Sequence, residues 1–141
     1  MRYWPFLLVL LYTSVVAGQD TTDVYRLSKM SYMELPYAQR INCDSTPGDN
    51  LSHRICLNLA FQEADAAMNA QFTKLLEQQE NDSLRQEIII YQQAWVMHRR
   101  RHSHSAADGY RGHLLGIIYL NHMLQITRIR KDELDFLLRE E

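Results

Sequence analysis

Three long stretches of the chain repeat apolar residues at steps of three and four, the spacing of one face of an α-helix. The first runs from about residue 51 to 79, the second opens near residue 83, and the third runs from about 113 to 138. No proline follows Pro47, so no proline interrupts these stretches. The pattern therefore predicts an all-helical protein, a small three-helix up-and-down bundle with short links.

Each predicted helix has an apolar stripe that we expect to face the core. Asp49 or Asn50 is expected to cap the first helix, because either side chain accepts a hydrogen bond from the free amides of a first turn. Ser83, with Gln86 three residues later, predicts a capping box at the start of the second helix. The predicted stripes consist of Leu57, Phe61, Ala64, Met68, Phe72 and Leu75 in the first helix, and of Leu84, Ile88, Tyr91, Trp95 and His98 in the second.

The start of the chain indicates export. Residues 1–18 have a basic beginning, an apolar run and then small residues, which is the order of a cleaved secretory signal peptide. The apolar run is shorter than the ~20 residues that span a bilayer, which argues against the alternative of an uncleaved membrane anchor. The cut is expected after Ala17 or Gly18, and the mature protein is expected to be periplasmic or secreted.

Between the signal peptide and the first helix, the pattern changes again. Residues 19–49 contain two prolines and one glycine and show no sustained helical period, which predicts an irregular N-terminal arm. The helical domain then occupies residues 50–141. Cys43 and Cys56 favour one disulfide over two free thiols, because exported proteins fold in an oxidising compartment.

The mature chain carries little net charge. Without Arg2 it has fourteen basic and seventeen acidic residues, a net charge of about −3 with neutral histidines. This charge is too mild to indicate a nucleic-acid partner, and it is compatible with a cationic protein partner.

No local signature of catalysis stands out. The sequence has no Gly-rich phosphate loop, no HExxH motif and no nucleophile with a base beside it, so we expect a non-enzymatic protein without a cofactor. His98 and His102 share one helix face and are candidate metal ligands, with a solvated helix end as the alternative. The run Arg99–Arg101 indicates either an anionic partner surface or, again, a solvated helix end.

Several segments match a known pattern in order. After Cys56, residues 64–72 resemble "aDxxLNxxY", residues 93–99 resemble "QxaWxxyR", and residues 127–130 resemble "TxxR". Together with Cys43 they span nearly all of the mature chain, which in this order resembles the LprI-like lysozyme inhibitor family of exported bacterial proteins. The matching motif residues, which we expect to be structural first, are Asp65, Asn69, Phe72, Gln93, Trp95, Arg99, Thr127 and Arg130.

The resemblance also implies a disulfide pairing and an ion pair to test. The family usually has two further cysteines, at positions that look like Ser103 and His122 here. Their joint absence is what a Cys43–Cys56 pairing implies. Arg100 stands where the family often has an acidic residue. Asp65 and Arg99 are a candidate ion pair between the first two long helices.

What the resemblance implies is a protein that binds and blocks a lysozyme-type muramidase or a related cell-wall hydrolase. Lysozymes are commonly cationic and work with carboxylates in a cleft, so an inhibitor needs only to occupy that cleft. The alternative is a non-enzymatic envelope module that binds an anionic wall polymer, a metal or an envelope protein. Arg99–Arg101 and the five histidines from His98 onward motivate this alternative.

Overall fold

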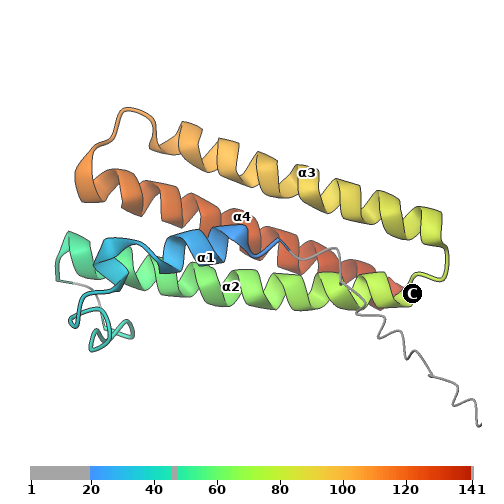
Figure 1. The fold of residues 1–141 in the computed structure, drawn as a ribbon, viewed down its shortest axis with the longest axis horizontal. Coiled ribbons are helices and arrows are strands. Elements are labelled where there is room, and N and C mark those ends of the chain that lie inside the picture. Colours follow the sequence, from blue (N-terminus) through green and yellow to red (C-terminus); the bar gives the residue numbers. More distant parts are fainter. Residues whose placement is uncertain (1–19, 46–47, 141) are drawn as a thin grey trace, which may run out of the picture.

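A computed structural model describes residues 20–45 and 48–140, and this part of the chain forms four α-helices. The three long ones are α2 (Asn50–Gln78), α3 (Asp82–Ala107) and α4 (Gly112–Glu140). They run up, down and up along the bundle, with α4 packed against both α2 and α3 (Figure 1). The all-helical class and the three long helices are confirmed. The predicted signal peptide lies outside the described residues.

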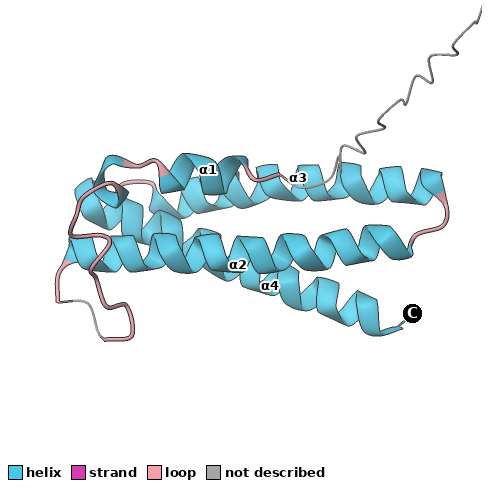
Figure 2. Ribbon diagram, turned by 60° about the horizontal axis from the view of Figure 1, so that its bottom comes forward, coloured by secondary structure: helices cyan, strands magenta, loops and turns pink. Residues whose placement is uncertain are grey.

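The expected count of three helices was wrong, because the N-terminal arm is partly helical. The arm contains α1 (Thr22–Ser28) and a short 3-10 helix, η1 (Ser31–Met33), and its described residues 34–45 have no regular helix or strand. A helix of seven residues is unstable in isolation, so α1 depends on its packing. In Figure 1, α1 lies along the first half of α2, where its Leu27 joins a core cluster with Phe61. In Figure 2 it lies beside α3, to which it is bonded through Asp23 and Arg99.

The core is divided into clusters along the long axis. Near α1, side chains of α2 and α4 pack against Leu27 in a first cluster. Further along α2 there is a second cluster, whose buried residues all come from α2 and α4. Both clusters join α2 to α4, so these two helices pack against each other in both parts of the core. The first cluster contains Leu27, Phe61, Ala107, Tyr119, Leu120, Met123 and Leu124, and the second contains Met68, Phe72, Leu75, Leu76 and Leu134.

The buried face of α3 differs from the predicted apolar stripe. Tyr91 is 57% exposed and His98 is exposed, whereas the face turned inward is largely polar. Ile88 and Trp95 of the predicted stripe are partly buried against the second core cluster. Hydrophobic periodicity misses the rest of the inward face because its polar side chains are paired within the bundle. The buried residues of α3 are Gln92, Val96, Arg99, Ser103 and Ala107.

The helix ends follow local rules, with one correction. Asp49 caps α2, its carboxylate accepting from the backbone N–H of Ser52 at 2.9 Å. Asn81, not Ser83, caps α3, because its side-chain oxygen accepts from the backbone N–H groups of Ser83 and Leu84. The predicted capping box was therefore placed two residues too late. In the α3–α4 link, Gly109 has a φ of 82°, a left-handed conformation that favours glycine.

The predicted disulfide is present between Cys43 and Cys56, whose Cα atoms are 5.4 Å apart. It ties the arm to the second turn of α2, beside a small cluster formed by Tyr32, Ala38 and Ile55. Within the described residues, none of the helices combines the length and apolar character needed to cross a bilayer.

Candidate functional site

The side chain of Arg99 is completely buried in α3 and bonds to each of the other three helices. Its Nη1 donates to Asp65 of α2 at 2.5 Å and to the hydroxyl of Thr127 of α4 at 2.9 Å. Its Nη2 donates to Asp23 of α1 at 2.9 Å. One guanidinium therefore joins all four helices, and the expected Asp65–Arg99 ion pair is present.

The partners of Arg99 are themselves held in place. The second carboxylate oxygen of Asp65 accepts from Asn69 at 3.0 Å, and Thr127 donates to the backbone carbonyl of Met123 at 2.7 Å. Burial raises the pKa of Asp65 above its ordinary value of 3.8, while the neighbouring Arg99 opposes that rise. We call Asp23, Asp65, Asn69, Arg99 and Thr127 the Arg99 network.

Aromatic rings complete the surroundings of this guanidinium. The ring centroids of Phe61 and Trp95 lie 5.1 and 5.0 Å from the central carbon of Arg99. Such distances suit cation–π attraction, which is stronger in a desolvated site than at the surface. Because every member of the Arg99 network is buried, it is a structural centre and offers no surface to a partner.

A second buried group surrounds Arg130 of α4. Its Nε donates to the side-chain carbonyl of Gln92 at 3.1 Å, and its Nη1 donates to Glu133 at 2.7 Å. The sequence motif pointed to Gln93, which is exposed, whereas the neighbouring Gln92 is buried and makes this contact. Gln92 lies seven residues, or two helical turns, before Arg99, so the two side chains share one face of α3. This spacing was the sequence signal from which the burial of Gln92 could have been predicted.

Sequence reasoning missed Asp23 and its pairing with Arg100. The Nε of Arg100 donates to Asp23 at 2.9 Å, and its Nη2 reaches Asp20 at 3.3 Å. Arg100 stands where the family often has an acidic residue, and here it pairs with carboxylates of the N-terminal arm. Hydrogen bonds to Thr22 and the charge of Arg100 hold the pKa of Asp20 below its usual 3.8, although burial opposes them.

The histidines come together without forming a metal site. The rings of His98 and His102 are 5.7 Å apart between centroids, and His122 of α4 lies 6.0 Å from His102. Within residues 20–45 and 48–140, however, no group of three or more histidine, cysteine, aspartate or glutamate side chains is placed to hold a metal ion.

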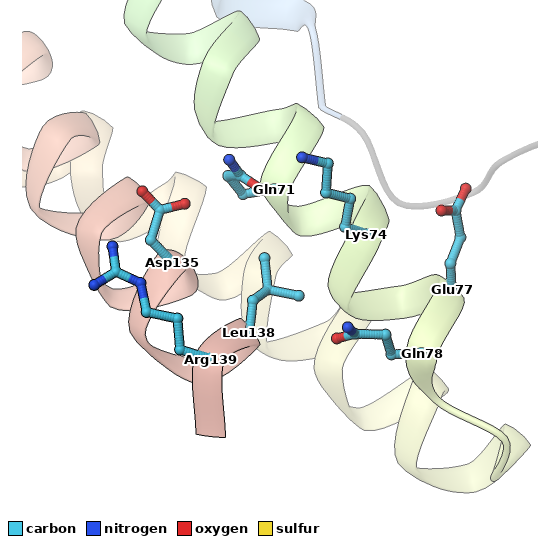
Figure 3. Close-up of a pocket in the computed structure, with 7 residues that line it drawn as sticks. All are labelled: Gln71, Lys74, Glu77, Gln78, Asp135, Leu138 and Arg139. Atoms are coloured by element: carbon cyan, nitrogen blue, oxygen red, sulfur yellow. The ribbon is translucent and has the colours of Figure 1, made fainter. Parts of the chain in front are cut away.

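The surface is hollowed at the end of the bundle where the C-terminus lies. Between α2 and α4 there is an open polar hollow of about 620 Å³. Figure 3 shows Leu138 between the two helices, with Lys74 on the α2 side and Asp135 on the α4 side. This hollow is bordered by side chains of both charges, so it has no strong preference for a charged ligand.

Between α3 and α4 there is a more apolar depression. Two hollows of about 630 and 410 Å³, both open to solvent, adjoin at Tyr91, Arg130 and Glu133. We call this depression the α3–α4 groove. Its apolar lining comprises Leu75, Leu84, Ile88, Tyr91, Ala94, Trp95, Ile126, Ile129 and Leu137.

Comparison with known proteins identifies the family. Residues 43–134, more than half of the chain, match the family model described as lysozyme inhibitor LprI. The match includes both cysteines and all the motif residues named from the sequence, but it begins after α1 and Asp23. No curated protein and no solved structure matches the chain. The chain belongs to the lysozyme inhibitor LprI family.

Proposed function

We propose that the mature chain acts outside the cytoplasm, in the periplasm or after secretion, as a protein that binds and blocks a lysozyme-type muramidase or a related cell-wall hydrolase. The observation that carries this proposal is the family match over residues 43–134. The Cys43–Cys56 disulfide supports the location, because such bonds persist in oxidising compartments.

Inhibition of this kind needs no catalytic group in the inhibitor. A muramidase cleaves a glycosidic bond with two carboxyl groups in an open cleft, so a protein that occupies or covers the cleft excludes the polymer. A rigid bundle suits this role, since little conformational freedom is lost when it binds. The Arg99 network supplies such rigidity by connecting four helices through one side chain.

The alternative, an envelope module that binds an anionic wall polymer, loses much of its motivation. Of the three arginines in Arg99–Arg101, Arg99 is completely buried and Arg100 pairs with Asp20 and Asp23. Only Arg101 is exposed, so the run does not present three cations on the surface.

The proposal is tested by following the clearing of a peptidoglycan suspension by several lysozymes, with the purified mature chain added. We expect the chain to slow clearing by at least one lysozyme in a saturable manner. The matched control is a peptidoglycan amidase, which cuts the same polymer at peptide-linked bonds and should keep its full rate.

The two arms of this assay separate the two functions. A hydrolase inhibitor slows the lysozyme alone, whereas a protein that coats the polymer slows both enzymes. No slowing of any lysozyme type at a large molar excess would contradict the proposed function.

A further inference from the structure

The α3–α4 groove is an unusual surface for a small exported protein. Along it Tyr91 is 57%, Ile129 68% and Leu84 45% exposed, and Tyr91 lies where its two hollows adjoin. Contiguous exposed apolar side chains of this kind mark interaction sites, and tyrosine and tryptophan contribute strongly to protein interfaces.

The floor of the groove is already held in a fixed shape. Arg130 is 3% exposed, bonded to Gln92 and Glu133, and its guanidinium carbon lies 5.0 Å from the ring centroid of Tyr91. The ring of Trp95 is 5.8 Å from the same carbon. These contacts orient the two aromatic side chains before any partner arrives, which lowers the entropic cost of binding.

Two exposed carboxylates border this groove. Residues 74–91 and 126–139, which form this end of the bundle, contain seven acidic and six basic residues, a balance of one negative charge. Glu87 and Glu133 line the groove itself. The groove therefore attracts cationic surfaces, because its two carboxylates are exposed while its one arginine, Arg130, is buried.

We propose that the α3–α4 groove is the surface on which the hydrolase docks, through a cationic segment that inserts an apolar side chain beside Tyr91. This inference rests on the proposed function and names its binding surface. The acidic rim repels an anionic wall polymer, and it also opposes a symmetric pair of copies, which would face their own acidic side chains. A basic protein segment that carries an apolar side chain complements both the acidic rim and the apolar lining.

The inference is tested by titration calorimetry of the mature chain with a cationic animal lysozyme at low ionic strength. Two groove variants, Tyr91→Ala and Glu87→Lys, should each weaken binding at least tenfold. Their matched controls are Tyr25→Ala, at a tyrosine 69% exposed on α1, and Glu63→Lys, at an exposed glutamate of α2. Both controls should bind within twofold of the unaltered chain, because Glu63→Lys makes the same change in net charge away from the groove. Far-UV circular dichroism and thermal midpoints verify that each variant is folded.

The outcomes separate the two proposals. If the unaltered chain binds and the groove variants bind equally well, the docking surface is wrong while the proposed function stands. If the unaltered chain binds no lysozyme type, both proposals are overturned. If light scattering shows a dimer that Tyr91→Ala dissociates, the groove holds a second copy and the inference is again overturned.

Discussion

Replacing Arg99 with methionine is expected to lower the free energy of unfolding by about 3–5 kcal/mol, the range for removing one partner of a buried ion pair. The substitution leaves the carboxylates of Asp65 and Asp23 at 0% and 1% exposure without their shared cation. It also removes the hydrogen bonds by which this side chain of α3 is joined to α1, α2 and α4.

Urea denaturation followed by circular dichroism measures this loss. The matched control is Arg101→Met, which alters an exposed neighbour and should change stability by less than about 0.5 kcal/mol. Equal stability of the Arg99 and Arg101 variants would show that the buried network contributes nothing to folding.

The loss of unfolding free energy in Arg99→Met should also depend on pH. Burial already raises the pKa of Asp65 above 3.8, and loss of the opposing cation raises it further. The folded variant then binds a proton at Asp65 more readily than the unfolded chain does. Its stability relative to the unaltered chain therefore improves as the pH falls from 7 toward 4. A deficit that grows on acidification would contradict this reading of Asp65.

Replacing Asp23 with alanine is expected to release α1 and to cost about 3 kcal/mol, at the lower end for a broken buried pair. The expected loss of unfolding free energy is smaller than for Arg99→Met, because in the Asp23 variant Arg99 keeps Asp65 as a partner. Asp23 accepts hydrogen bonds from Arg26, Arg99 and Arg100, so the substitution removes one carboxylate partner from each of these arginines.

Limited proteolysis with trypsin gives the most specific readout of α1. Cleavage after Arg26 and Lys29 should accelerate in Asp23→Ala while α2, α3 and α4 stay protected. The matched control is Asp44→Ala, at an exposed aspartate of the same arm. Unchanged cleavage in the Asp23 variant would mean that packing of Leu27 alone holds α1 on the bundle.

The long helices were predictable because their signals are local. Asp49 caps α2 through its own neighbours, and Phe61, Met68 and Phe72 follow a helical period that the structure buries. The Asp65–Arg99 pair was accessible through the spacing of family motifs, although 34 residues separate the two side chains.

Elements that depend on distant contacts were not predictable in the same way. The seven-residue α1 is held by Asp23, whose bond to Arg99 spans 76 residues of sequence. The inward face of α3 was misassigned because Gln92 and Arg99 are buried as bonded polar groups, which a hydrophobic period does not detect. The same error concealed the α3–α4 groove, since Tyr91 was assigned to the core and is exposed.

The chain has two distinct regions: a buried network that includes family-motif residues, and an exposed groove that we propose binds the hydrolase. The most direct test of this separation is amide chemical-shift mapping of the isotope-labelled mature chain during titration with a cationic lysozyme. Shifts are expected to concentrate at Leu84, Tyr91, Ile129 and Leu137, with little change at the Arg99 network. Shifts confined to the other end of the bundle around His102, His104 and His122, or no shifts with any lysozyme type, would contradict the proposed docking surface.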